Sequence, residues 1–433
     1  MTKQQTKFKQ TEIGMIPEDW EVKDIQQVVT KLGDGLHGTP KYDDSGTYYF
    51  VNGNNLANGK IKVNKDTKKC SKEEFEKYKK ELTNRTILVS INGTLGNIAI
   101  YNDEKIILGK SACYLTVKDE YNLQFIKYVL RNTAFQNHIQ NNATGTTIKN
   151  VSLKQMREYK FGIPMNAKEQ FLISKILADL DFKIELNQQM NKTLEAIGQV
   201  IFKHWFVDFE FPNEEGKPYK SSGGEMVESE LGEIPKGWKV SKIEKEFETI
   251  LGGTPSTTNK SYWENGTVAW INSGEINKFR ITEPTAYITK DAVNNSATKL
   301  MPKGTTVLAI TGATLGQVSR IEIDTCANQS VIGIIENKDI PSEYIYLWIK
   351  HTIIGLISHQ TGGAQQHINK NNVNELNILL PDDSLMLKFK EMIKPIFNNI
   401  STNCFESQSL SQIRDSILPR LMSGKIRVVV EAK

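Results

Sequence analysis

The most regular hydrophobic pattern of the chain begins at Ala167 and continues to about Val207. This stretch contains no proline and one glycine, and its apolar residues recur at steps of three and four, which is typical of an amphipathic helix. We predict one helix of about 40 residues, roughly 60 Å long. Its apolar stripe consists of Ile173, Leu177, Leu180, Ile184, Met190, Leu194, Ile197, Ile201 and Trp205.

The same pattern returns from Leu385 and predicts a second long helix, for which Gly424 in "MSGKI" provides the stop. Pro395 lies early in this pattern, where it either bends the helix or marks its first turn. Two amphipathic helices bury their stripes most simply against each other, so we expect an antiparallel pair with a domain at each end. The second stripe consists of Phe389, Ile393, Ile396, Ile400, Leu410, Ile413, Ile417 and Leu421.

The first stripe is interrupted at Asn187 and Asn191, near the middle of the predicted helix. Polar residues in a helical seam can fix the register of two helices at a cost in stability. The alternative is a local irregularity of the pattern without such a role. The sequence leaves both interpretations open.

The regions before the two helices contain short strand-like runs, separated by loops rich in Gly, Asn, Thr and Ser. A helical pattern over residues 123–139, with a counterpart over 342–358, adds an α element to each region. We therefore predict two compact α+β domains. The clearest strand-like runs are 86–91, 98–101, 305–310 and 331–336.

The two regions are copies of one another. "IGMIPEDWEV" from Ile13 and "LGEIPKGWKV" from Leu231 share the pattern G-x-I-P-x-x-W-x-V at an offset of 218 residues. "TILVSINGTLGNIAI" faces "TTVLAITGATLGQVS", and "LEAIGQVIFKHWF" faces "LSQIRDSILPRLM", at nearly the same offset. Matches in order at an almost constant spacing indicate an internal repeat of a domain-sized unit.

The composition suits folded domains, since 39% of the 433 residues are hydrophobic and 24% are charged. The opening "MTKQQTKFKQ" lacks the apolar stretch of a signal peptide, and no run of about 18 apolar residues predicts a membrane span. Four distant cysteines without a C-x-x-C spacing disfavour a disulfide framework or a zinc site. We expect a cytoplasmic protein without a membrane partner. The net charge of +4 is too small to indicate nucleic-acid binding by itself.

No catalytic motif is complete. "LGKS" at 108–111 and "GGTPSTTNKS" at 252–261 lack the first glycine of a phosphate-binding loop, and "TGATLG" lacks the G-x-G-x-x-G spacing. H-E-x-x-H, G-x-S-x-G and Asp/Asn-Pro-Pro-Tyr/Phe motifs are absent, and the six histidines form no metal-ligand spacing. "DFKIE" at 181–185 resembles part of a nuclease signature, but a solvated helix face explains it better. We predict a chain without a catalytic site of its own.

The loops instead carry amide, hydroxyl and cationic side chains, which are the groups that read base edges and hold phosphates. Loops are polar for other reasons too, so no single one is decisive. The candidate DNA-binding residues combine polar reach with a loop position: Thr39, Lys41, Asn54, Asn92, Lys149, Thr254, Ser256, Thr257, Asn259, Lys260, Asn272, Gln365, Gln366 and Lys370.

Four features together resemble the specificity subunit of type I restriction-modification systems, over nearly the whole chain: the doubled G-x-I-P-x-x-W-x-V, "LGGTPSTTNKSYWENGTVAWINSGEI", "LEAIGQVIFKHWFVDFEFP" and "IRDSILPRLMSGKI". The resemblance implies an α+β fold class, with two globular α/β target recognition domains separated by two long antiparallel α-helices (a coiled coil) and a pseudo-twofold internal repeat. The implied parts are recognition domain 1 at 1–165, the first long helix at 166–210, a linker at 211–228, recognition domain 2 at 229–381, the second long helix at 382–425 and a C-terminal tail at 426–433.

The resemblance further implies that each domain reads one half of a bipartite, asymmetric target in double-stranded DNA. The helices would dock two modification (methyltransferase) subunits, for which a duplicated chain offers two equivalent surfaces, and the complex would also recruit restriction subunits. No cofactor is then expected in this chain, because S-adenosylmethionine belongs to the methyltransferase partner, and ATP and Mg belong to the restriction subunit. The expected docking or helix-packing residues are Ile184, Leu194, Ile201, Trp205, Phe206, Ile413, Ile417 and Leu421.

The first copy departs from this pattern. It has "LGDGLHGTPKYDDSG" where the second has "LGGTPSTTNKSYW", and a charged insert, "KKCSKEEFEKYKKEL", at 68–82. Contact residues therefore do not transfer from one domain to the other. Two other classes remain open: the recognition part of a fused methyltransferase-nuclease, which would bind S-adenosylmethionine, and a protein-binding scaffold, which would not bind DNA.

Overall fold

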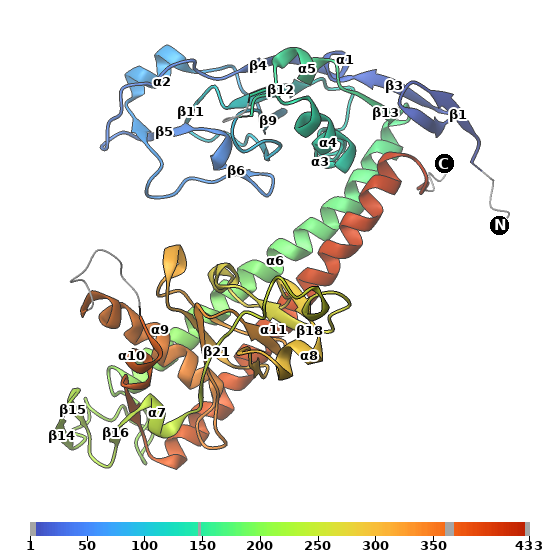
Figure 1. The fold of residues 1–433 in the computed structure, drawn as a ribbon. Coiled ribbons are helices and arrows are strands. Elements are labelled where there is room, and N and C mark those ends of the chain that lie inside the picture. Colours follow the sequence, from blue (N-terminus) through green and yellow to red (C-terminus); the bar gives the residue numbers. More distant parts are fainter. Residues whose placement is uncertain (1–5, 146–148, 360–367, 429–433) are drawn as a thin grey trace. The chain divides into compact units, whose positions relative to one another are not determined.

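The structure is a computed structural model that describes residues 6–145, 149–359 and 368–428. It divides into two compact units, Met1–Lys183 with Ser409–Lys433, and Ile184–Gln408. Each unit contains one globular domain and a segment of each of two long helices, α6 (Ala167–Phe206) and α11 (Asp383–Met422) (Figure 1).

The two long helices confirm the prediction from the hydrophobic pattern. The Asp382 side chain caps α11 by accepting a hydrogen bond from the backbone N of Leu385 at 3.0 Å. The helix ends just before Gly424, whose φ of +68° is the left-handed conformation that favours glycine. Pro395 lies in the interior of α11, so the alternative that it marks the first turn is wrong.

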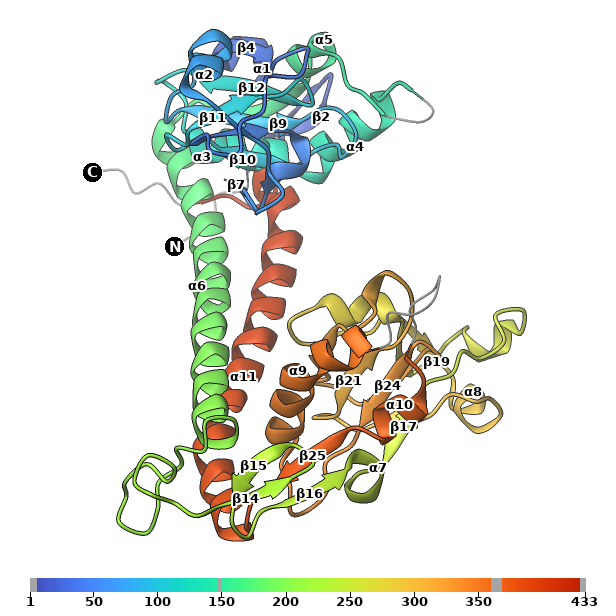
Figure 2. The same ribbon diagram turned by 90° about the vertical axis from the view of Figure 1, so that its left-hand side faces the viewer.

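Segments of α6 and α11 pack side by side in each unit, and they run in opposite directions (Figures 1 and 2). In both units the contacting residue numbers rise along α6 as they fall along α11, so the predicted antiparallel pairing is confirmed within each unit. The pairs that show it are Asp181 with Arg414 of α11 and Glu169 with Arg427, which follows the end of α11, in the first unit, and Asn187 with Glu406 and Trp205 with Phe389 in the second.

The first domain precedes α6 and is built from short strands with small helices between them. Its main sheet has the antiparallel order β10-β9-β12-β4, and a second sheet has the order β11-β5-β8 with β11 and β5 parallel. The elements are β1 (Phe8–Thr11), β2 (Gly14–Pro17), β3 (Trp20–Asp24), α1 (Ile25–Val28), β4 (Val29–Asp34), β5 (Tyr48–Val51), η1 (Gly53–Asn55), β6 (Leu56–Ala57), β7 (Lys60–Ile61), β8 (Lys69–Cys70), α2 (Lys72–Tyr78), β9 (Thr86–Ser90), β10 (Ile98–Ile100), β11 (Ile106–Leu108), β12 (Ala112–Val117), α3 (Leu123–Arg131), α4 (Thr133–Asn142), α5 (Leu153–Arg157) and β13 (Lys160–Pro164).

The second domain lies between α6 and α11 in the sequence and has two four-stranded sheets, in the orders β17-β24-β21-β22 and β19-β18-β23-β20. Its elements are β14 (Met226–Ser229), β15 (Gly232–Pro235), β16 (Lys239–Lys242), α7 (Ile243–Glu246), β17 (Thr249–Leu251), η2 (Lys260–Tyr262), β18 (Val268–Ile271), η3 (Ser273–Asn277), β19 (Ala286–Ile288), α8 (Lys290–Asn294), β20 (Leu300–Met301), β21 (Thr306–Ala309), η4 (Gly312–Thr314), β22 (Val318–Arg320), β23 (Thr325–Ala327), β24 (Val331–Ile334), α9 (Ser342–His359), α10 (Lys370–Asn374) and β25 (Asn377–Leu380).

The strand order confirms the internal repeat. The sheet β4-β12-β9-β10 corresponds strand by strand to β17-β24-β21-β22, and the parallel pair β5 and β11 corresponds to β18 and β23. Individual backbone bonds correspond too: Gly35 N donates to Ala112 O at 3.3 Å, and Gly252 N donates to Val331 O at 2.9 Å. These bonds keep the same register although the surrounding loop sequences differ.

The repeated G-x-I-P-x-x-W signature has the same structural role in both copies. Its glycine ends a hairpin turn with positive φ, 99° at Gly14 and 86° at Gly232. The isoleucine and the tryptophan of each copy are buried in the hydrophobic core of their own unit. These core residues are Ile16 and Trp20 in the first unit, and Ile234 and Trp238 in the second.

Three details differ from the sequence-based expectations. The pattern over 123–139 forms two helices, α3 and α4, because the backbone of Asn132 is extended, whereas its counterpart is the single helix α9. The charged insert at 68–82 contains β8 and α2. The predicted linker at 211–228 is partly structured: Phe211 is buried and stacks on Trp238 with ring centroids 5.1 Å apart, and β14 begins at Met226.

Candidate nucleic-acid interface and docking faces

The loop 252–263 of the second domain presents five of the predicted DNA-binding side chains to solvent. It starts at Gly252, where a Cβ would lie 2.1 Å from a neighbouring backbone oxygen, so only glycine fits. Two indole groups hold the loop: Trp263 Nε1 donates to Ser256 O and Trp270 Nε1 donates to Gly253 O, each at 3.2 Å. The exposed predicted residues are Thr254, Ser256, Thr257, Asn259 and Lys260.

Hydrogen bonds orient several of these polar groups. Thr254 Oγ1 donates to Gln329 Oε1 at 2.6 Å, and the hydroxyls of Ser256 and Thr258 lie 2.9 Å apart. Asn259 Oδ1 accepts a hydrogen bond from the backbone N of a residue in η2 at 3.2 Å. A loop whose backbone and side chains are fixed in this way loses little conformational entropy when it binds a partner.

The other predicted residues of the second domain have different environments. Asn272 is half-buried and caps η3, because its Oδ1 accepts a hydrogen bond from Gly274 N at 2.7 Å. Lys370 is half-buried at the start of α10. Gln365 and Gln366 lie outside the described residues.

In the first domain, the structure brings two predicted residues onto adjacent segments. Asn92 Nδ2 donates to Asn150 Oδ1 at 3.2 Å, and Gly93 N donates to Lys149 O at 3.0 Å. Asn92 is half-buried by this contact and Lys149 is exposed. The remaining predicted residues, Thr39, Lys41 and Asn54, are exposed on loops and in η1.

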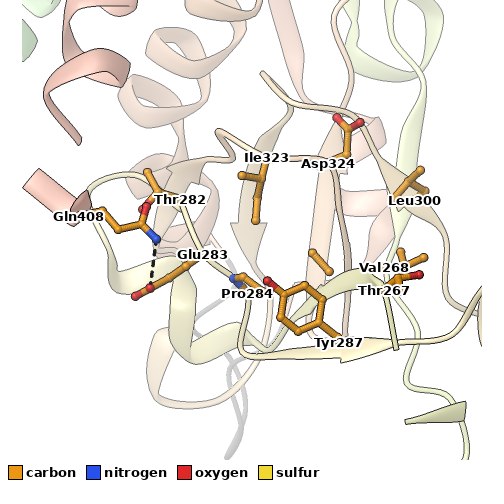
Figure 3. A pocket seen from close by; sticks show the side chains of 11 residues that line it. Thr267, Val268, Thr282, Glu283, Pro284, Tyr287, Leu300, Ile323, Asp324 and Gln408 are labelled. Carbon is orange, nitrogen blue, oxygen red and sulfur yellow. Dashed lines mark hydrogen bonds between the residues drawn. The ribbon is translucent and has the colours of Figure 1, made fainter. Parts of the chain in front are cut away.

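A pocket of about 410 Å³ opens on the second domain (Figure 3). Its lining combines the apolar Val268 and Leu300 with the carboxylates of Glu283 and Asp324, and Gln408 Nε2 donates to Glu283 Oε2 at 3.4 Å. Carboxylates repel a phosphate backbone, and none of the predicted DNA-binding residues lines this pocket. Within the described part of the chain, no His, Cys, Asp and Glu side chains cluster in a way that could hold a metal ion.

The predicted docking or packing residues divide into three groups by exposure. Four of them are buried: Ile184, Trp205, Phe206 and Leu421. Three are half-buried: Leu194, Ile201 and Ile417. Ile413 is 49% exposed, so it does not pack between the helices.

The predicted apolar stripe of α6 needs a correction in the second unit. Met190 and Ile197, which the hydrophobic pattern assigned to the buried stripe, are 43% and 42% exposed. The buried seam continues instead through polar and small residues, because those positions keep the helical spacing that faces α11. The residues of this seam are Ile184, Asn187, Asn191, Glu195, Gly198, Phe202 and Trp205.

Both long helices also expose apolar side chains. Three exposed positions of α6 have exposed apolar counterparts on α11 at the repeat offset of 216 residues. An apolar residue on a helix surface is unremarkable when it is single, but the same exposed positions in two copies indicate a repeated surface. The matched pairs are Phe171 and Leu387, Ile176 and Met392, and Ile197 and Ile413.

Among the described helices, none is long and apolar enough to cross a membrane. Residues 17–196 and 235–403 match the family model "Type I restriction modification DNA specificity domain". The type I restriction enzyme MjaIX specificity subunit of Methanocaldococcus jannaschii is 24% identical over 440 residues, which cover 98% of this chain and 97% of that protein. The HindI specificity subunit of Haemophilus influenzae is 26% identical over 334 residues, 65% of this chain and 72% of that protein.

The fold has a match among solved structures. The S subunit of a type I restriction-modification system from M. genitalium superposes with a TM-score of 0.57 at 17% sequence identity, over 93% of this chain and 96% of that one. The two matched segments of the family model coincide with the two copies that the strand order defines. The chain therefore belongs to the family of type I restriction-modification DNA specificity subunits, and it carries the family's domain twice.

Proposed function

We propose that each of the two domains reads one half of a bipartite DNA target, and that the two long helices bind two methyltransferase subunits. The chain itself is non-catalytic in this proposal. S-adenosylmethionine would be bound by the methyltransferase partner, and ATP and Mg by a restriction subunit.

The matched exposed positions of the long helices carry the docking part of the proposal. Exposed apolar side chains at the same three positions of both helices fit contacts with two copies of one partner. The match is positional: Ile197 and Ile413 are the same residue type at equivalent places of α6 and α11. Burying one such side chain in an interface stabilises it by roughly 1.5–3 kcal/mol.

The DNA-reading part is supported by the loop 252–263. Its exposed hydroxyl, amide and amino groups are those that contact bases and phosphates, and its backbone is held in place by Trp263 and Trp270. The corresponding segment of the first domain differs in sequence, while the strands that support it keep the same register. Two like scaffolds with unlike loops fit a target whose two halves differ in sequence.

Counting the bound methyltransferase subunits by native mass spectrometry tests the docking proposal. Ile197→Asp and Ile413→Asp each place a charge on one of the matched positions, so each single variant is expected to bind one subunit and the double variant none. Gln412→Asp is the matched control, because it adds the same charge at an exposed neighbouring position of α11. Two subunits on the double variant, or a loss of binding by Gln412→Asp, would contradict the proposal.

A further inference from the structure

A carboxylate of α6, Glu195, is buried at the contact between the helices and the second domain. Its Oε2 accepts a hydrogen bond from Arg280 Nη2 at 2.7 Å. Its Oε1 accepts one from Tyr346 OH at 2.7 Å and one from Lys350 Nζ at 2.8 Å. Arg280 belongs to a loop of the second domain, and the other two donors belong to α9, so one side chain of α6 joins two separate elements of this domain.

Arg280 extends this contact deeper into the domain. Its side chain is fully buried, and the guanidinium lies over the rings of Tyr346 and Phe397 at 4.6 and 5.2 Å from their centroids. Its Nε lies 3.7 Å from Glu322 Oε1, which also accepts a hydrogen bond from Arg320 Nη1 at 2.7 Å. Phe397 belongs to α11, so the guanidinium touches both long helices.

A second carboxylate of α6, Asp181, makes the equivalent kind of contact in the first unit. Its Oδ2 accepts hydrogen bonds from Tyr128 OH and Arg131 Nη1 of α3, both at 2.7 Å. Its Oδ1 accepts one from Arg414 Nη1 of α11 at 2.9 Å. Each domain thus presents a tyrosine and a cation, about one helical turn apart, to a carboxylate of α6.

The two carboxylates are not related by the internal repeat. Arg131 and Lys350 are equivalent residues of the two domains, since "FIKYVLRN" matches "YIYLWIKH". The residue equivalent to Asp181 in the second copy, however, is Phe397, over which Arg280 lies. The carboxylate that contacts the second domain is therefore Glu195 of α6. The repeat alone would have placed this carboxylate at position 397 of α11.

Buried charges constrain geometry more strictly than apolar contacts do, because a charge that loses its partner in a dry environment is strongly destabilised. Burial raises the pKa of the Glu195 carboxyl, but the charges of Arg280 and Lys350 outweigh burial and lower it overall. The carboxylate therefore stays charged at neutral pH. A small rotation of the domain on the helix would separate it from all three donors at once.

We propose that Glu195 and Asp181 are positioning residues that fix the second and the first recognition domain on the long helices, and that each domain fits only its own carboxylate. Rigid placement of the domains would help the chain to read two half-sites at a set spacing. Only this benefit for DNA reading rests on the proposed function. The placement itself is a property of the free chain. It is measurable without DNA or partner subunits.

The test measures the distribution of distances between two spin labels on the full-length chain. The labels are attached through non-canonical amino acids at Val200 of α6 and Lys290 of α8, both of which are exposed. Native Glu195 is expected to give one narrow distribution, and Glu195→Gln a broad one. Lys350→Gln removes a half-exposed donor and keeps the buried pair, so it is expected to fold and to broaden the distribution less.

Two variants serve as matched controls. Asp179→Asn removes an exposed carboxylate of α6 that pairs with Lys175 at the surface, and Asp181→Asn removes the carboxylate of the other unit. Both are expected to keep the native distribution. If Glu195 only stabilised the fold, Glu195→Gln would lower the melting temperature without widening the distance distribution of the folded molecules. A native distribution for both Glu195→Gln and Lys350→Gln would overturn the proposal.

A transplanted domain tests the second half of the proposal. In a chain where a copy of residues 14–164 replaces 232–380, the second copy of Arg131 takes the place of Lys350 beside Glu195. The test chain therefore also carries Glu195→Gln, so that the second copy of α3 faces Phe397 and has no carboxylate to contact. Phe397→Asp restores that carboxylate and is expected to slow amide exchange of the transplanted α3 at least about tenfold, a factor that corresponds to about 1.4 kcal/mol. Equal exchange with and without Phe397→Asp would show that the domains do not need their own carboxylates.

Discussion

The polar residues in the seam between α6 and α11 make a quantitative prediction. Asn403 Nδ2 donates to Asn191 Oδ1 at 2.9 Å, and Asn191 Nδ2 lies 3.4 Å from Ile400 O and 3.3 Å from Cys404 Sγ. Asn191 is 5% exposed and Asn403 is 8% exposed, so water cannot replace a lost bond. Of the two asparagines that interrupt the apolar stripe of α6, Asn191 thus bonds to α11, which favours the interpretation that it fixes the register of the two helices.

The perturbation is Asn191→Ala. It removes the acceptor of Asn403 Nδ2 and leaves that buried donor unpaired, which costs about 1–3 kcal/mol. Asn403→Ala has a similar cost, because it leaves Asn191 Oδ1 without its donor. The double variant leaves neither group unpaired, so its cost is expected to fall below the sum of the two single costs by about 0.5–3 kcal/mol.

Hydrogen exchange with mass spectrometry is the appropriate assay, because a chain of two compact units need not unfold in one step. The free energy of opening is read from peptides that cover 184–206 and 389–408. Lys192→Ala, on the exposed side of α6, is the control and is expected to change it by less than about 0.5 kcal/mol. Additive costs in the double variant, or single costs no larger than the control, would refute the register role.

Trp205, Glu195, Lys260 and the net charge of the chain each give a further prediction. Trp205→Ala removes a 6% exposed ring from the core of the second unit and is expected to lower the free energy of opening by about 3–5 kcal/mol. The methylated sequence should stay unchanged, and a changed target would contradict the packing role of Trp205. Burial raises the pKa of the Glu195 carboxyl, but Arg280 and Lys350 lower it below its ordinary value of 4.5. The difference in stability between the native chain and Glu195→Gln should therefore be full above pH 4.5 and shrink as the pH falls through the pKa of the folded state. A stability difference that does not depend on pH would count against this prediction. Lys260→Ala in the assembled complex should weaken DNA binding and reduce the slope of log affinity against log salt by about 0.9, as measured by anisotropy, whereas an unchanged slope would exclude a phosphate contact. The isolated chain, with a net charge of only +4, should bind DNA weakly and tighten with methyltransferase subunits in a gel-shift series; equal affinity with and without the partner would be the contrary result.

The sequence predicted the architecture well, because a repeat and a helical period are local signals. The positions of α6 and α11, the stop at Gly424 and the two α+β copies followed from spacing alone. Asn132 shows where spacing fails. The apolar period runs through it, but its extended backbone ends α3, and a period does not report backbone conformation.

The seam of α6 was harder to predict, for a physical reason. A hydrophobic stripe marks where apolar residues recur, but the buried face in the second unit continues through Asn191, Glu195 and Gly198. The stripe through Met190 and Ile197 lies on the exposed face instead. A buried polar residue can be recognised only with its partners, and the partners of Glu195 are far away in the sequence at Arg280 and in α9.

The candidate DNA-binding residues were predictable as exposed polar groups and no further. Thr254, Asn259 and Lys260 share one loop because Trp263 and Trp270 hold it, and neither indole contact is visible from composition. Which loop atoms meet a base depends on the shape of the complex with DNA. Those residues remain predictions.

The central claim, that each domain reads one half of the target, is tested most directly by mapping methylated bases in a host that carries a domain-exchange variant. In this variant, residues 213–381 are replaced by the same segment of a relative with a known target, and the methyltransferase subunits are unchanged. The account predicts that one half of the methylated sequence changes to that of the relative, while the other half and the number of base pairs between them stay the same. A change in both halves, or in neither, would contradict it.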